Sequence, residues 1–203
     1  MNSSFDSFIK YFLPLFFFIY QFVLFYFRSY KVYKNTGIKP FVFGRSSSLH
    51  DFLGKSFLLV NLLNLTGILI YSFFYRFYNY TYPFLIHEYI YLRLFGFSLL
   101  LSSFIFSFIA QLQMGNSWRI GIDKNNLSPL VSTGLFKYSR NPFSLGVLLS
   151  LTGIFFILPN ILTLLSLVLG FFFMQVQIRL EEEFLTNNIP GYKIYFSKVR
   201  RWI

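Results

Sequence analysis

The sequence predicts an all-α integral membrane protein with about five transmembrane helices. Of its 203 residues, 55% are hydrophobic and 24% aromatic, and only 12% are charged. A soluble domain of this size carries about 25% charged residues. The apolar residues also gather in runs close to the roughly twenty residues that a helix needs to cross a bilayer core. Both observations argue against a water-soluble globular domain.

Five apolar runs are expected to form the membrane-spanning helices: residues 11–27, 56–75, 90–110, 142–158 and 161–178. The first run lacks the basic start and the small-residue cleavage site of a signal peptide, so we interpret it as a retained helix. We expect a flexible basic loop at 37–55, because this segment contains Gly, Ser and Pro. The tyrosine-rich connector at 76–89 is expected to lie at the membrane interface.

The fourth and fifth runs are expected to form a tight helical hairpin. Pro142 suits the first turn of a helix, where its missing N–H would have no partner. Pro159 and Asn160 leave room only for an antiparallel return of the chain. Three glycines are candidates for close approach between helices: Gly146, Gly153 and Gly170.

Two asparagines, Asn61 and Asn64, lie inside the second run. They are three residues apart and therefore share one helical face. An amide side chain inside a membrane favours a partner across a helix interface. We interpret both asparagines as packing contacts between helices.

The basic residues lie mainly on one side of the five predicted spans. Fifteen of the 18 lie in three segments on that side: 28–55, 111–141 and 179–203. Only Lys10, Arg76 and Arg93 lie on the other side. Because cytoplasmic loops are enriched in Lys and Arg, we expect the N-terminus outside and the C-terminus in the cytoplasm. The same distribution explains the formal net charge of +11, so no nucleic-acid partner is expected.

The composition also limits the chemistry, because the chain has no Cys and only two His residues. The absence of Cys excludes disulfides, iron–sulfur clusters, Cys-ligated zinc and thiol nucleophiles. Two isolated His residues do not form a metal-binding pattern. No metal is therefore expected.

Two polar segments flank the predicted hairpin and are expected to meet on its cytoplasmic side. Residues 130–146 are basic and enter the hairpin, whereas three consecutive glutamates at 181–183 leave it. Acids at the C-terminal end of a helix oppose the helix dipole, which favours cations there. A cation is therefore expected beside the glutamates, either Arg140 or a cationic ligand. In the alternative, the helix end is solvated and Arg179 pairs with Glu183.

Three motifs in the second half of the chain resemble one family. The segment G-L-F-K-Y-S-R-N-P-F-S-L-G at 134–146 is similar to G-x-Y-x-x-x-R-[HN]-P-x-Y-x-G, and E-E-x-x-L at 181–185 is followed by Y-x-x-Y at 192–195. The segment M-G-N-S-W-R-I-G-I-D at 114–123 is similar to one that many bacterial members carry before the first motif. Over about residues 111–203, the chain thus resembles a short bacterial-type member of the isoprenylcysteine carboxyl methyltransferase and phospholipid methyltransferase superfamily. This resemblance implies a bacterial inner membrane.

The chain departs from the family pattern at three positions of the first motif. Phe136 and Ser144 stand where the family usually has Tyr, and Asn141 replaces the commoner His. An amide cannot shuttle a proton as imidazole does. The last motif also has one residue fewer than usual before Tyr192.

The resemblance implies an S-adenosylmethionine-dependent methyltransferase without a Rossmann domain, and the chain has no G-x-G-x-x-G after a strand pattern. It also implies one structural unit in two parts, a membrane domain of three helices at 1–110 and a methyltransferase core at 111–203 that ends in a cytoplasmic helix. Methyl transfer from a sulfonium requires alignment and the exclusion of water. A sulfonium cation suits aromatic faces and carboxylates.

The resemblance further implies the residues of the site. Arg140 would hold a carboxylate of the cofactor or the acceptor by a bidentate pair. Glu181 and Glu182 would bind the amino or ribose groups of the cofactor, or position the acceptor, so these three residues are the catalytic candidates. The other cofactor-binding candidates are Val131, Gly134, Leu135, Tyr138, Asn141, Pro142, Leu145, Leu185, Tyr192 and Tyr195. Adenine would be enclosed by residues 131, 134, 135, 138 and 145.

A site within membrane helices implies a lipophilic acceptor and contact with membrane lipids. A prenylcysteine-like carboxylate is already nucleophilic, whereas a lipid amine needs a base such as Glu182 to accept its proton. The residues leave both acceptors open, and they contain no pattern that indicates an oligomeric state.

Three other classes of protein compete with this interpretation. A related membrane architecture serves NADPH-dependent reductases, although the E-E-x-x-L motif and five short spans favour the methyltransferase. A noncatalytic cofactor-binding membrane protein is the second alternative, because Phe136 and Asn141 depart from the family pattern. A transporter is disfavoured, because charges avoid the interiors of the predicted spans.

Overall fold

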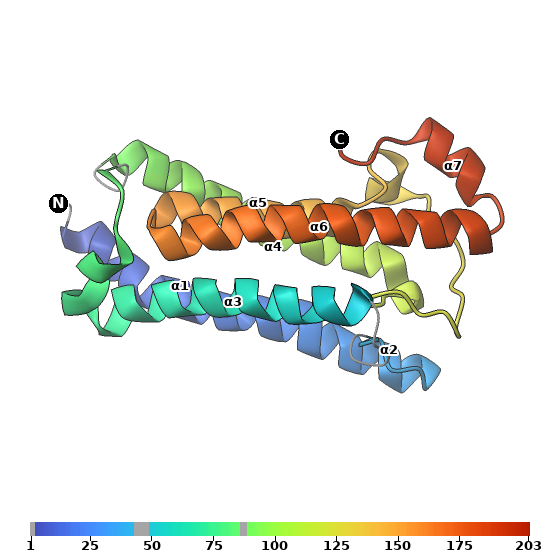
Figure 1. Ribbon diagram of the computed structural model, residues 1–203, viewed down its shortest axis with the longest axis horizontal. Helices are drawn as coiled ribbons and strands as arrows, with labels where there is room; N and C mark the ends of the chain where they lie inside the picture. The colour runs from blue at the N-terminus through green and yellow to red at the C-terminus, as the bar shows by residue number, and fades with distance from the viewer. Residues whose placement is uncertain (1–2, 43–48, 86–88) are drawn as a thin grey trace.

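The computed structural model describes residues 3–42, 49–85 and 89–203, and these form an all-helical bundle (Figure 1). The helical elements follow the chain in this order: α1 (Ser3–Gln21), the π-helical segment η1 (Phe22–Phe27), α2 (Arg28–Thr36), α3 (Leu49–Phe73), η2 (Tyr75–Thr81), α4 (Ile90–Met114), η4 (Gly115–Ser117), η5 (Gly134–Lys137), α5 (Pro142–Ile157), α6 (Ile161–Asn188) and α7 (Tyr192–Lys198). Extended pairing among the described residues is limited to isolated bridges between Phe41 and Ile120 and between Ser139 and Arg200. The predicted all-α class is confirmed.

Four helical stretches in the described residues are long and apolar enough to cross a membrane: Ser4–Thr36, Asp51–Phe73, Ile90–Ser117 and Ile161–Asn188. α5 is apolar as well but has only 16 residues. Its length is therefore about 24 Å, against about 30 Å for a bilayer core. The helices are those of an integral membrane protein, but the predicted count of five full spans is not confirmed.

Several helix boundaries differ from the predicted ones. α1, η1 and α2 are continuous, and the stretch ends at Gly37, whose positive φ of 71° caps the helix. α3 begins at Leu49, inside the predicted loop at 37–55. Residues 43–48 of that loop, including Arg45, and residues 86–88 of the predicted connector lie outside the described residues.

The predicted fifth span at 161–178 is also too short, because α6 continues to Asn188. Its extension is rich in Arg, Leu and Glu, which are good helix formers. Pro190 follows shortly after its end, as is common beyond helix C-termini. The three glutamates therefore lie within the helix, not beyond its end.

The long helices form a closed ring. α1 packs on α3, α3 on α6, α6 on α5 and α5 on α4. Aromatic rings close the circle between α1 and α4, with centroid distances of 5.0 Å for Phe12–Phe97 and 6.0 Å for Phe16–Phe104. Figure 1 shows α2, η5 and α7 gathered at one end of the bundle, which we call the loop end. The start of α1, η2 and the α5–α6 turn mark the opposite end, which we call the N-terminal end.

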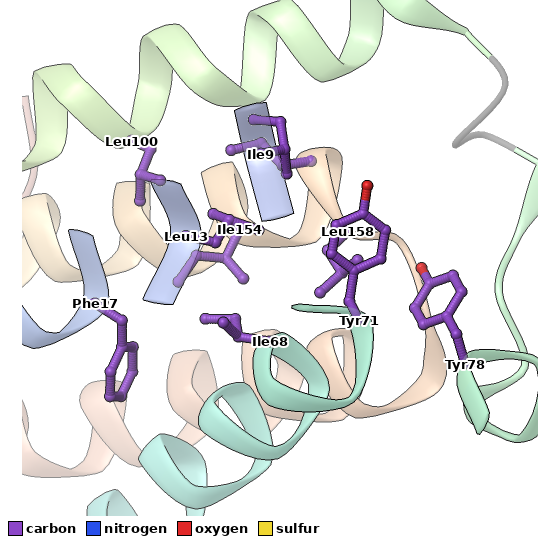
Figure 2. Close-up of a cluster of buried hydrophobic side chains, with 10 residues drawn as sticks. Ile9, Leu13, Phe17, Ile68, Tyr71, Tyr78, Leu100, Ile154 and Leu158 are labelled. Carbon is purple, nitrogen blue, oxygen red and sulfur yellow. The ribbon is translucent and has the colours of Figure 1, made fainter. Parts of the chain in front are cut away.

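The N-terminal end is filled by buried apolar side chains from α1, α3, α4 and α5 (Figure 2). Ile9, Leu13 and Ile68 are at most 1% exposed. An ion pair lies beside this cluster, with Arg93 Nη1 2.7 Å from Asp6 Oδ1. The hydroxyl of Tyr71 donates to the same carboxylate oxygen at 3.1 Å. Apolar packing and a paired charge thus close this end together.

Glycines bring α4 and α5 into backbone contact. A Cβ placed on Gly153 would lie 2.8 Å from the carbonyl oxygen of Gly96, and one on Gly146 would lie 2.1 Å from Ser107 Oγ. The predicted close approach is confirmed, but these two glycines face α4 and not the hairpin partner α6. Gly170 does face α5 within the hairpin, since its Cβ would lie 2.4 Å from a methyl group of Leu151.

The predicted antiparallel hairpin of α5 and α6 is confirmed. Asn160 caps α6, because its Oδ1 accepts the backbone N–H groups of Leu162 at 2.9 Å and Thr163 at 3.1 Å. The backbone N–H of Asn160 in turn donates to the Thr163 hydroxyl at 3.2 Å, which completes a capping box. This turn returns α6 toward the loop end, where its glutamates meet the segment that precedes α5.

Candidate active site

The segment that leads into α5 is held against the end of α4. Gly134 has φ of +63°, and a Cβ at this position would lie 2.4 Å from Gln113. The backbone N–H of Leu135 donates to Gln113 Oε1 at 2.7 Å. Glycine is therefore required here both by the left-handed backbone and by the close approach. The contact places η5 and Arg140 at the loop end.

A π-helical segment in the first long helix also supports this end. In η1, the backbone N–H of Arg28 bonds to the carbonyl of Val23, and the carbonyl of Leu24 accepts Gln111 Nε2 at 2.6 Å. The buried Arg28 side chain donates to the carbonyl of Gln111 at 3.0 Å and that of Gly115 at 2.7 Å. A cation at these last carbonyls of α4 is favoured by the helix dipole. These contacts fix the first long helix to the end of α4, where the segment that leads to α5 begins.

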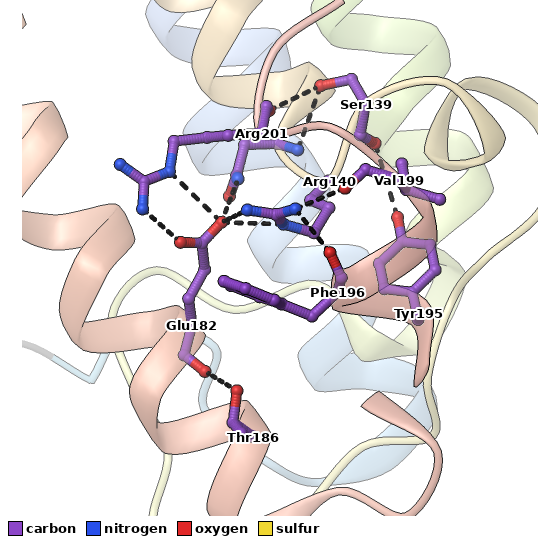
Figure 3. A network of polar contacts seen from close by, with 9 residues as sticks. Ser139, Arg140, Glu182, Thr186, Tyr195, Phe196, Val199 and Arg201 are labelled. Carbon is purple, nitrogen blue, oxygen red and sulfur yellow. Dashed lines mark hydrogen bonds and ion pairs between the residues drawn. The ribbon is translucent and has the colours of Figure 1, made fainter. Parts of the chain in front are cut away.

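Glu182 joins the segment before α5 to the C-terminal tail (Figure 3). Its Oε1 lies 2.9 Å from both Nε and Nη2 of Arg140, and its Oε2 lies 2.5 Å from Arg201 Nη2. Asn141 Nδ2 donates to Oε1 at 3.4 Å. The predicted cation beside the glutamates is therefore Arg140 itself, joined by a second arginine, Arg201, that the sequence analysis did not include.

The Arg140 guanidinium makes further contacts to the chain end. Its Nη1 donates to the carbonyls of Phe196, at 3.0 Å, and of Val199. Its central carbon lies 4.0 Å from the centroid of the Phe196 ring. Because Nε and Nη2 face Glu182, no edge of the guanidinium offers two free nitrogens. Bidentate binding of a ligand carboxylate, as predicted for Arg140, does not fit this arrangement.

Backbone contacts fix the C-terminal tail along the same segment. The N–H of Arg140 donates to the carbonyl of Arg200 at 2.9 Å, and the Ser139 hydroxyl donates to the carbonyl of Arg201 at 3.0 Å. These bonds and the Glu182 contacts make one network from α6, the segment before α5 and the tail. The network brings together Arg140, Asn141 and Glu182 of the predicted site.

The two tyrosines of the last motif are buried in packing contacts. Tyr192 and Tyr195 form a cluster with Ile189, against which Leu130 and Leu185 pack. The Tyr195 hydroxyl donates to the carbonyl of Phe136 at 2.6 Å. Burial raises the pKa of Tyr195 to about 12, so this hydroxyl stays protonated and keeps its bond. In this structure both tyrosines hold α7 in place.

A cavity of about 960 Å³ opens inside the ring toward the loop end. Its volume is near the upper limit of typical ligand pockets. Side chains of α1, η1, α2, α3, α5 and α6 line it, together with residues 118–121. Four predicted site residues are on its wall: Arg140, Asn141, Pro142 and Glu181. Among the described residues, the other nine predicted site residues do not line the cavity: Val131, Gly134, Leu135, Tyr138, Leu145, Glu182, Leu185, Tyr192 and Tyr195.

The cavity wall includes residues that the sequence analysis did not assign to the site. Trp118 and Phe143 meet edge to face at a centroid distance of 4.6 Å, and Phe25 lies 5.8 Å from Phe143. Phe136 and Ser144 line the same cavity. The recognised motifs contain four of these residues, so the motifs could have indicated them as site residues: Trp118, Phe136, Phe143 and Ser144. Phe25 lies in a helix without a motif.

Glu181 and Glu182 have opposite surroundings although they are adjacent on α6. Successive helical residues are rotated by about 100°, so adjacent side chains point to different faces. Glu182 is 4% exposed and binds two arginines. Glu181 lines the cavity and has no hydrogen bond or ion pair in the described part of the chain. Glu181 is thus the carboxylate that is available to a ligand.

One family comparison identifies this part of the chain. Residues 91–191 match the family model described as phospholipid methyltransferase. The match includes nearly all of α4, the loop, the α5–α6 hairpin and both glutamates. It begins before the region in which the motifs were recognised and ends before Tyr192. No curated protein and no solved structure matches the chain.

The match confirms the recognition that the motifs supported. The chain belongs to the phospholipid methyltransferase family through a domain that covers about half of its length, in agreement with the superfamily named above. Its fold and family together define an integral membrane protein with a methyltransferase kind of function.

Proposed function

We propose that this protein transfers a methyl group from S-adenosylmethionine to the amine of a lipophilic acceptor, inside the cavity at the loop end. One observation carries this proposal. Glu181, a carboxylate of the phospholipid methyltransferase domain with no partner among the described residues, lines a large cavity.

The residues of the cavity fit the cofactor. Aromatic faces and a nearby carboxylate stabilise a sulfonium cation, and the cavity is lined by Phe25, Trp118, Phe143 and Glu181. When bound, the cofactor supplies an activated methyl group, so the chain needs no metal for this reaction. Lys39 lies exposed at the rim of the cavity and would bind the cofactor carboxylate in place of Arg140.

The surroundings of the two glutamates favour an amine over a carboxylate as the acceptor. The bound cofactor would supply the methyl carbon to the amine nitrogen and would keep the electron pair of the broken carbon–sulfur bond on its sulfur. The nitrogen then loses a proton, and Glu181 accepts it. Glu182 cannot take this role, because arginine contacts occupy both of its oxygens. An acceptor carboxylate next to Glu181 would be repelled by the like charge.

The loop end is proposed to face the cytoplasm of a bacterial inner membrane, with the N-terminus outside. The support is the excess of Lys and Arg in the segments at this end. The soluble cofactor is present in the cytoplasm, so a cavity that opens toward the cytoplasm suits the reaction.

Methyl transfer from labelled S-adenosylmethionine to total membrane lipid tests this proposal with the purified protein. We expect a labelled lipid amine, and we expect Glu181→Gln to lower the rate by about 100-fold or more, because the proton acceptor is lost. Glu183→Gln is the matched control, since Glu183 is exposed on the same helix, and its rate should equal that of the wild type.

Three results would overturn the proposal. A transfer rate that Glu181→Gln leaves unchanged would remove Glu181 from the chemistry. Binding of NADPH in preference to S-adenosylmethionine, with no labelled lipid, would favour a membrane reductase. Binding of S-adenosylmethionine without any transfer would favour a noncatalytic protein.

A further inference from the structure

The cavity is not apolar throughout, because two buried amides on its wall lack partners. Asn64 of α3 is 2% exposed and Gln177 of α6 is 7% exposed. Neither Asn64 Oδ1 nor Gln177 Oε1 has a hydrogen-bond partner among the described residues. Asn61 behaves as the packing contact that we predicted, since Gln21 of α1 donates to its Oδ1. Asn64 differs, because its carbonyl oxygen bonds to nothing described.

Asn64 lies far from the methyl-transfer region. α3 and α6 run side by side (Figure 1), and Ser166 Oγ donates to the carbonyl of Val60 at 3.0 Å. Asn64 is one turn beyond Val60, at the level of Ser166 on α6. From Ser166 to Glu181 the helix rises by about 22 Å. The cavity therefore reaches about 20 Å into the bundle from Glu181, whereas Gln177 is only one turn away.

A plain hydrocarbon chain in this part of the cavity would leave the Asn64 amide unsatisfied. A buried polar group without a partner destabilises the protein more than the hydrogen bond itself contributes. A hydroxyl both donates and accepts, so it can satisfy either end of an amide. A lipid chain that carries a hydroxyl at the depth of Asn64 would meet this requirement.

We propose that the acceptor is a long-chain lipid amine with a hydroxyl group far along its chain, and that Asn64 recognises this hydroxyl. The inference rests on the proposed function for the position of the amine near Glu181. Asn64 lies outside residues 91–191, the part that matches the phospholipid methyltransferase family. The N-terminal half of the chain therefore selects the acceptor, while the matched half provides Glu181, the proposed proton acceptor.

Competition binding tests this selection without requiring methyl transfer. Octadecylamine and its derivatives with a hydroxyl on carbon 16 or on carbon 2 compete with labelled octadecylamine for the purified protein in detergent. We expect the 16-hydroxy derivative to bind about 3- to 10-fold more tightly than the other two, as one buried hydrogen bond provides. The Asn64→Leu variant should lose this preference and should bind octadecylamine at least as well as the wild type.

Two control variants locate the effect. Ser72→Ala removes another buried hydroxyl oxygen without a described partner on α3, but Ser72 does not line the cavity, so the preference should remain. Gln177→Leu removes the amide nearest Glu181 and should also leave the preference for carbon 16. Equal binding of the three amines by the wild type would overturn the inference, as would a preference that survives in Asn64→Leu.

The comparison of amines within the wild type needs no variant, so a variant that fails to fold does not prevent the test. Failure of methyl transfer with an intact preference for the 16-hydroxy amine would contradict the proposed reaction alone. Methyl transfer to unhydroxylated amines with no preference in binding would contradict this inference alone.

Discussion

The two ends of the bundle are closed in different ways. At the N-terminal end, side chains such as Ile9, Leu13 and Ile68 fill the space between helices, and the Asp6–Arg93 ion pair lies beside them. At the loop end, the ring encloses a cavity, and Glu182 with two arginines holds the chain segments around it. Apolar packing with one ion pair beside it supports the N-terminal end, whereas a polar network supports the loop end.

This difference separates stabilising charges from functional ones. Asp6 is partly exposed and Glu182 is buried, but both have arginine partners, and their positions are explained by the elements that they join. Glu181 lines the cavity at the loop end and has no hydrogen-bond or ion-pair partner among the described residues. A carboxylate without a hydrogen bond or ion pair in the described part of the chain is better explained by a ligand, and the following predictions test this division.

The largest expected effect comes from breaking the network at the loop end. Glu182→Ala leaves Arg140 and Arg201 without their carboxylate, and removing one partner of a buried pair costs about 3–5 kcal/mol. Unfolding in mixed micelles measures this loss, with the exposed Glu183→Ala as a control that should change stability by less than about 0.5 kcal/mol. Equal stability of the two variants would show that packing alone closes the loop end.

Two truncations of apolar side chains compare the cost in stability at the packed N-terminal end with the cost beside the cavity. Leu13→Ala should cost about 2–4 kcal/mol, because it opens a void in a packed core. Val147→Ala removes a side chain that already borders the cavity, and it should cost less than about 1 kcal/mol because fewer contacts are lost. The same unfolding measurement applies to both, and similar losses would contradict the distinction.

The hairpin turn should have a smaller effect on stability. Asn160→Ala removes the cap of α6, which typically costs about 1 kcal/mol. Asn187→Ala, at an exposed position near the other end of the same helix, is the control. Thermal unfolding of both variants measures the difference, and no difference would mean that packing alone sets the turn.

The smallest expected effect is a pH dependence in the loop after α4. Burial opposes ionisation of Asp123, but hydrogen bonds from the Asn126 side chain and from the backbone N–H groups of Asn125 and Asn126, with Arg119 nearby, lower its pKa overall. Its contribution to stability is therefore complete above the unfolded pKa of about 3.9 and is lost as pH falls through the lower folded value. Between pH 5 and 3, the wild type should lose stability more steeply than Asp123→Asn, and parallel curves would refute this role.

Much of the fold could be predicted from the sequence. Apolar runs located the long helices, and Pro159 with Asn160 located the hairpin, because bilayer thickness and turn chemistry act on local sequence. The helix ends were less predictable, since α6 continues through polar residues that form helix well. The close contact of α5 with α4 depends on glycines whose partners lie in another helix.

The site was predictable only in part. The motifs identified Arg140, Asn141, Pro142 and Glu181, all of which line the cavity. They did not distinguish the roles of the two adjacent glutamates, because that depends on which face of α6 meets the arginines. Residues of the N-terminal half, such as Phe25 and Asn64, line the cavity without belonging to any motif.

The sequence by itself determined the membrane class, the hairpin and the family of this protein, because each is written in residues close together along the chain. Only the tertiary structure decided that Glu182 is bound by arginines while Glu181 and Asn64 face a cavity. The reason is geometric, since adjacent residues on a helix point to different faces, and the neighbours of each face come from distant parts of the chain.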